Sequence, residues 1–189
     1  TEILGRKNVA IGVSALQTQN ADVDTFNTAV GFNAGTAVTT GIQNTLIGGL
    51  AGDALTDADY NVGVGYNSLG ANTVGSRNTA IGYNALDAMN PSSATDTYNT
   101  AVGFYVGKDI TTGIQNTIVG ALAGDAMTTG SYNDAFGLNA LSSNTSAQRN
   151  TAIGYGALLA FNVTANTDTY NTAVGNLAGT ALTTGVRNT

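Results

Sequence analysis

The hexapeptide NTAIGY occurs twice, at residues 78–83 and 150–155, and close variants recur along the whole chain of 189 residues. We take the asparagine of each copy as the anchor of a repeat unit. The steps from one anchor to the next are 19, 17, 17, 17, 21, 17, 17, 17, 21 and 17. This repeat constrains the fold more than any other feature, because one unit is too short to bury a hydrophobic core and must stack on its neighbours. The anchors are Asn8, Asn27, Asn44, Asn61, Asn78, Asn99, Asn116, Asn133, Asn150, Asn171 and Asn188.

Three 17-residue units and one 21-residue unit together form a larger repeat, which we call the block. Residues 27–98 and 99–170 are two complete blocks that align without a gap and are identical at 43 of 72 positions. Partial copies occupy residues 1–26 and 171–189. We therefore predict one continuous repeat domain over residues 1–189, built by duplication of a four-unit block.

Each unit contains a short apolar stretch rich in β-branched residues, which favour strands over helices. The residue three positions after the anchor is always apolar and is Val or Ile in every unit except the one with Phe136. We predict strands of about four or five residues that end at glycine turns. When these strands stack roughly 4.8 Å apart, each Val or Ile would lie on the Val or Ile of the next coil, and we expect these side chains to form the core. The predicted fold is an all-β parallel β-solenoid (β-helix or β-roll) of 17-residue coils, with a 21-residue coil every fourth, forming a rod roughly 50 Å long.

Two further positions of the unit have predicted structural roles. We expect the anchor asparagines to form a ladder, each side-chain amide bonding those of the coils above and below. Glycine stands four residues after every anchor, as expected where the backbone has a positive φ or approaches a neighbour closely. The predicted ladder is Asn27, Asn44, Asn61, Asn78, Asn99, Asn116, Asn133, Asn150 and Asn171, and the predicted turn glycines are Gly31, Gly48, Gly65, Gly82, Gly103, Gly120, Gly137, Gly154 and Gly175.

The 21-residue units end in MNPSSATDTY (residues 89–98) and FNVTANTDTY (residues 161–170), which we expect to bulge outward as surface loops. Asp24, Asp96 and Asp168 stand three residues before their anchors, where a short acidic side chain can cap a turn by accepting a backbone N–H. The residue just before the anchor is aromatic in several units. Such rings could stack on sugars, but shielding the coil edges or packing between chains is the interpretation that we favour. These aromatic residues are Phe26, Tyr60, Tyr98, Tyr132 and Tyr170.

The composition argues against several classes of function. The chain has no Cys, His or Trp, so disulfides, thiolates and imidazole bases are excluded. Without His, we would expect a serine nucleophile to use a lysine as its base, and the only lysines are Lys7 and Lys108. The net charge of −6 argues against nucleic acid, and no apolar run is long enough to insert into a membrane. We predict no enzyme activity, no catalytic or metal-binding residue and no cofactor. Only a third of each unit fits the hexapeptide pattern of left-handed β-helix acyltransferases, so we do not expect this enzyme class.

The pattern N-T-A-[VI]-G-[YF]-N-A-[LG], with T-T-G-x-x-N-T between copies, resembles the repeats of bacteriophage tail-fibre proteins over essentially all 189 residues. It is also similar to the S-V-A-I-G repeats of trimeric autotransporter adhesin heads, whose coils are shorter than the units of this chain. The resemblance implies a homotrimer displayed outside a cell or on a virion. It also implies a structural shaft segment that continues end to end in a longer fibre and gives it length and rigidity, with host attachment as a further expected role.

Two alternatives remain open at this stage. The chain could be a bacterial surface adhesin or extracellular filament whose lateral face binds host-surface glycans through the tyrosine positions or the longer loops. It could also be an ice-binding solenoid, since threonine follows the anchor in 8 of 11 units. We rank the ice-binding hypothesis last, because Val or Ile stands two residues beyond that threonine, where a second threonine ladder is expected.

Overall fold

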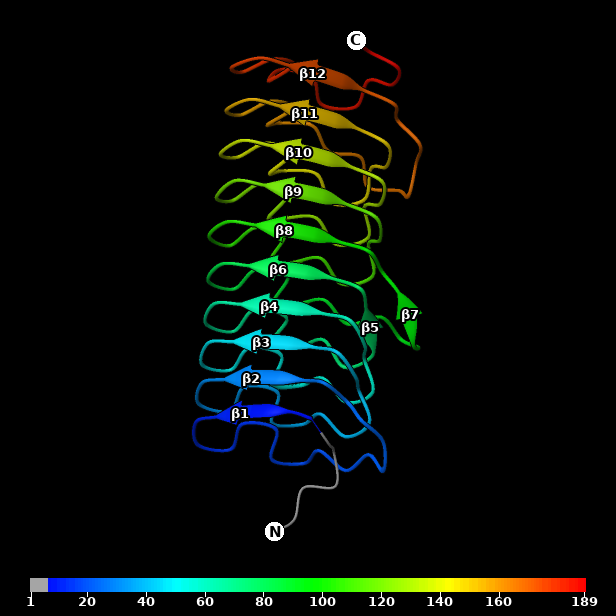
Figure 1. Ribbon diagram of the computed structural model, residues 1–189. Helices are drawn as coiled ribbons and strands as arrows, with labels where there is room; N and C mark the ends of the chain where they lie inside the picture. Colours follow the sequence, from blue (N-terminus) through cyan, green and yellow to red (C-terminus); the bar gives the residue numbers. More distant parts are fainter. Residues whose placement is uncertain (1–6) are drawn as a thin grey trace.

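The computed structural model describes residues 7–189, so the first six residues of the partial copy 1–26 lie outside it. The described chain is a β-solenoid of about ten turns, in which ten short strands stack along one side of the molecule (Figure 1). All neighbouring strands are parallel, which confirms the predicted fold class. The strands of this sheet are β1 (Val9–Ile11), β2 (Thr28–Val30), β3 (Thr45–Ile47), β4 (Val62–Val64), β6 (Thr79–Ile81), β8 (Thr100–Val102), β9 (Thr117–Val119), β10 (Asp134–Phe136), β11 (Thr151–Ile153) and β12 (Thr172–Val174).

Each strand residue pairs with the residue at the same position of the next unit, for example Ala29 with Leu46 and Val30 with Ile47. The strands are three residues long rather than the predicted four or five. A residue with positive φ precedes each anchor and another follows each strand, so the extended segment cannot continue in either direction. The residue before the anchor has a φ of 55° at Gln43, and the glycine after the strand has a φ of 137° at Gly48. Neither conformation belongs to a β-strand.

The core lies on the opposite face of the strands from the one that we predicted. The middle residue of each strand points inward, and Ala29, Leu46 and Ile118 are fully buried. The Val/Ile position points outward and is half-buried or exposed, with Ile47 40% exposed. The expected Val/Ile core is therefore wrong. Side chains alternate between the two faces of a strand, and here the alternation places Thr and Val or Ile outside and the residue between them inside.

Larger core residues come from the part of each coil that follows the strand. The position eight residues after the anchor holds either a buried leucine, such as Leu86, or a glycine, such as Gly52. Both adopt positive φ, 51° and 55° respectively. A Cβ at Gly52 would lie 2.7 Å from side-chain carbons of both Leu46 and Leu55, which fill the space that a leucine occupies in other coils. This exchange keeps the interior closely packed from coil to coil.

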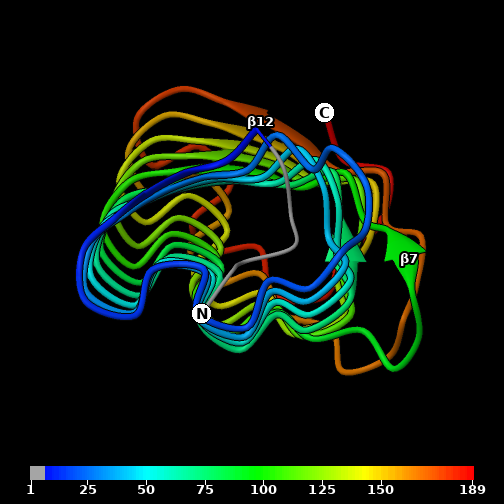
Figure 2. The same cartoon turned by 60° about the horizontal axis from the view of Figure 1, so that its bottom comes forward.

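The longer coils bulge outward, as predicted. Strands β5 (Gly75–Ser76) and β7 (Thr95–Asp96) form a separate two-stranded parallel sheet. In Figure 2 the loop that carries β7 stands out from the side of the solenoid, and the orange loop of the second long coil stands out on the same side. Residues 92–94 and 164–168 are exposed. Met89 and Phe161, which begin the two predicted tails, are instead buried in the core.

Candidate functional site

The nine predicted ladder asparagines are all buried and occupy one column along the rod. Asn44 illustrates the pattern. Its backbone N–H and its Nδ2 both donate to Oδ1 of Asn27, at 2.8 and 3.3 Å. Its Nδ2 also donates to the carbonyl oxygen of Ala58 at 2.8 Å. Its Oδ1 accepts from the backbone N–H and Nδ2 of Asn61, at 3.0 and 3.2 Å. Each ladder asparagine therefore bonds the coil before its own and the coil after it, through both its side chain and backbone groups.

A threonine takes part in the ladder in each coil that is longer than 17 residues. Thr97 Oγ1 donates to Asn78 Oδ1 at 2.8 Å, in place of the Nδ2 bond of the next ladder asparagine, and Asn99 Nδ2 keeps its bond to the carbonyl oxygen of Gly113. Equivalent hydroxyls reach Asn150 at 2.7 Å and Asn8 at 2.8 Å. The sequence analysis missed this role, although the constant threonine of the DTF and DTY tails is its signal. These buried threonines are Thr25, Thr97 and Thr169.

The predicted turn glycines all have φ between +127° and +149°, a region that residues with a side chain rarely adopt. From Gly31 to Gly154, an added Cβ would collide with the carbonyl oxygen of the equivalent glycine in the next coil, and at Gly120 it would lie 2.5 Å from that oxygen. At Gly175 an added Cβ would meet no carbonyl oxygen and would contact only Ala178. Both reasons for glycine at this address, positive φ and close backbone approach, therefore apply at eight of the nine positions.

The position before the anchor carries two clusters of exposed side chains. Arg77 Cζ lies 4.5 Å from the ring centroid of Tyr60 and 5.9 Å from that of Tyr98. Arg77 Nε pairs with Asp96 at 2.9 Å, and the hydroxyl of Tyr98 donates to the same carboxylate at 3.1 Å. The hydrogen bond to Asp96 raises the pKa of the Arg77 guanidinium. The same arrangement recurs at the equivalent positions of the next block, in Tyr132, Arg149, Asp168 and Tyr170.

These clusters give the tail aspartates a different role from the turn cap that we expected. Asp96 and Asp168 pair with arginines of the preceding coil. Asp24 pairs with Lys7 at 2.8 Å, and the lysine Nζ lies 5.3 Å from the ring centroid of Phe26. Each long coil is thus tied to the preceding coil by an ion pair beside an aromatic ring. Such exposed contacts contribute little to stability individually.

A second charged column lies nine residues after the anchor. Burial raises the pKa of Asp53, Asp87 and Asp125, with repulsion from a neighbouring carboxylate adding to the effect at each. Lys108 stands between Asp87 and Asp125 in the column and acts to lower the pKa of both, although its ammonium group bonds Asp109 at 2.6 Å. Within residues 7–189, no group of three or more acidic, His or Cys side chains could hold a metal ion. This column therefore offers partly buried carboxylates but no ligand cage.

The outward side of the ten-stranded sheet is largely apolar over its whole length. We call it the outer sheet face and define it as the residues one, three and five positions after each anchor. Thirty residues occupy these positions in the ten coils, and Asp134 is the single charged one among them. Tyr66 and Tyr83 stack with ring centroids 5.4 Å apart, and Tyr83 and Phe104 with centroids 5.6 Å apart. The large exposed members are Val9, Ile11, Val13, Phe32, Ile47, Tyr66, Ile81, Tyr83, Phe104, Phe136, Leu138, Ile153, Tyr155 and Val174.

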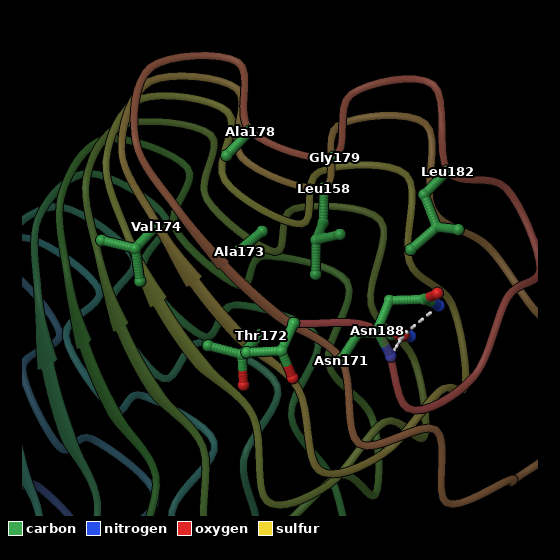
Figure 3. Close-up of a pocket in the computed structure, with 10 residues that line it drawn as sticks. Leu158, Asn171, Thr172, Ala173, Val174, Ala178, Gly179, Leu182 and Asn188 are labelled. Carbon is green, nitrogen blue, oxygen red and sulfur yellow. Dashed lines mark hydrogen bonds between the residues drawn. The ribbon is translucent and has the colours of Figure 1, made fainter.

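A pocket of about 310 Å³ opens at the C-terminal end of the solenoid (Figure 3). It is lined by core residues such as Leu158, Ala173 and Leu182, and by the ladder residues Asn171 and Asn188, whose amides bond each other at 2.8 Å. In the other coils, the equivalent residues are covered by the coil above. The pocket is the exposed end of the core, and none of its described lining residues has a titratable side chain.

Comparison of the chain with protein-family models, with curated proteins and with solved structures finds no match. The described residues include no helix that is both long and apolar enough to cross a bilayer. The geometry on which a functional assignment can rest is therefore the ladder, the two tyrosine–arginine clusters and the outer sheet face.

Proposed function

We propose that this chain is a structural shaft segment of an extracellular or virion fibre, as its resemblance to phage tail-fibre repeats implies. The observation that carries the proposal is the unbroken register of ten parallel strands, with hydrogen bonds of both strands and ladder directed along the rod. A structure bonded in this way at every coil resists bending and extends by simple addition of coils. Assembly of three copies, the homotrimer implied by the same resemblance, would stiffen it further.

Deletion of residues 99–170 tests this function, because it removes one complete block and joins Tyr98 to Asn171, the equivalent of Asn99. Four coils at about 4.8 Å each predict a rod shorter by about 19 Å with an unchanged cross-section. Duplication of the same block should lengthen the rod by the same amount. Small-angle scattering and electron microscopy measure both dimensions. A compact particle, or a length that does not follow the number of coils, contradicts the shaft.

A second candidate function is attachment through a lateral face that binds host-surface glycans. The observation that favours it is the recurrence of the exposed Tyr60–Arg77–Tyr98 cluster in the next block, around Arg149. Aromatic rings and a guanidinium group suit the apolar and polar surfaces of a sugar. A glycan array with the wild-type chain and with the double variant Arg77→Gln, Arg149→Gln distinguishes the two functions. Binding that the double variant loses favours attachment, and the absence of binding leaves a spacer.

A further inference from the structure

We propose that the outer sheet face is the surface along which copies of this chain lie side by side, with their rod axes aligned. The inference deepens the proposed shaft by naming the contact between copies, and it rests on that function. It identifies the occupant of the face as a second copy of the same chain. Three properties of the face support this choice: its area, its lack of charge and its period.

The exposed apolar area is larger than a monomer ordinarily presents to water. Five of the aromatic side chains on the face are 42–58% exposed, which leaves on the order of 100 Å² of each in solvent. With the exposed Val, Ile and Leu side chains, the face reaches on the order of 1,000 Å². The largest apolar patch of a typical monomer covers about 300–600 Å². A stable interface buries about 800 Å² per partner, so this face alone is large enough for one.

Charged groups are concentrated elsewhere on the rod. The two arginine clusters lie before the anchors, and the column of Asp53, Asp87 and Asp125 lies beyond the turn that follows each strand. The chain has 12 acidic and 6 basic residues, yet only Asp134 lies on the outer sheet face. Depletion of charge at the centre of a patch, with aromatic residues enriched, is characteristic of protein–protein interfaces.

The period of the face determines the kind of partner that fits it. Its side chains repeat at the strand spacing of about 4.8 Å over ten coils, so a matching surface must repeat at the same spacing over the same distance. The position five residues after the anchor carries a bulky side chain in most coils, but every fourth coil has a small residue there. These small residues are Gly49 and Ala121, which stand at equivalent positions of the two blocks between larger side chains. Another copy of this chain has both periods by construction, and most soluble oligomers are symmetric assemblies of identical chains.

Charge placed on the face should separate the copies. Ile81 and Ile153 are equivalent residues of the two blocks, both outward and 37% and 40% exposed, so lysine at these positions disturbs no core packing. We expect Ile81→Lys, Ile153→Lys to weaken self-association by at least about 100-fold, because an interface would bury both unpaired ammonium groups. The matched control is Ser92→Lys, Thr164→Lys, which adds the same charge at equivalent exposed loop residues away from the face.

Sedimentation velocity over a range of concentrations measures the association, and far-UV circular dichroism confirms that both variants retain the fold. Wild type and control should sediment as oligomers, and the face variant as a chain of 19.0 kDa. A monomeric wild type, a face variant that stays oligomeric, or a control that dissociates equally would overturn the inference. A monomer that still scatters as a rod of the expected length refutes only this contact, whereas a compact particle refutes the shaft itself.

Discussion

Asn116→Ala tests how much one step of the asparagine ladder contributes to stability. Asn116 is fully buried, and its Nδ2 donates to Asn99 Oδ1 at 3.0 Å and to the Gly130 carbonyl at 2.9 Å. Its Oδ1 accepts from the backbone N–H and Nδ2 of Asn133, at 3.0 and 3.2 Å. Alanine leaves the Gly130 carbonyl and the Asn133 backbone N–H without these partners. The other two groups keep one hydrogen bond each, since Asn99 Oδ1 still accepts the backbone N–H of residue 116 and Asn133 Nδ2 still donates to Ala147.

A buried polar group that loses its partner costs about 1–3 kcal/mol, so the two orphaned groups should lower the free energy of unfolding by about 2–6 kcal/mol. Reversible urea unfolding, followed by circular dichroism, measures this change through the midpoint and slope of the transition. Asn90→Ala is the control, because Asn90 is exposed and its side chain makes one surface hydrogen bond, from Thr73 Oγ1 at 2.7 Å. If the two variants lose the same stability, the ladder is not a principal source of cohesion between coils.

Gly120→Ala should prevent folding or lower the thermal midpoint sharply, since Gly120 has a φ of +132° and an added Cβ would lie 2.5 Å from a carbonyl oxygen. Gly49→Ala should be tolerated, because the nearest atom to an added Cβ there belongs to a tyrosine ring at 3.5 Å. Calorimetry of the two variants measures both thermal midpoints. Thr97→Val keeps the side-chain shape but removes the hydroxyl that donates to the ladder, so urea unfolding should show a loss of about 1–3 kcal/mol. Burial raises the folded-state pKa of Asp125, so the protonated carboxyl favours folding and that advantage is lost as pH rises through the folded-state pKa. Asp125→Asn should therefore melt above wild type at neutral pH and lose its advantage below the ordinary aspartate pKa, and an equal gain at every pH would contradict the electrostatic cause.

The repeat itself made much of the fold predictable. Because a single 17-residue unit cannot bury a core, stacking was required. The apolar stretch between Asn and Gly, which contains β-branched residues in every unit except that of Phe136, marked the strands of the main sheet. The glycine column followed from the same physics, since a residue that recurs at one address in every unit meets one backbone requirement. The outward loops of the 21-residue units also followed, because extra residues in a stack of constant register have no place inside it.

The sequence by itself determined which residues share a face, and only the tertiary structure decided which face is inside. The alternation along Thr28, Ala29 and Val30 is a property of any strand, but burial depends on what the rest of the coil brings against it. Leu16, Leu46 and Val38 close over the alanine side, so Val30 remains outside. The contacts of Asp96 with Arg77 and of Thr97 with Asn78 were equally hidden in the sequence, because each joins residues 19 positions apart that only the winding of the chain makes neighbours.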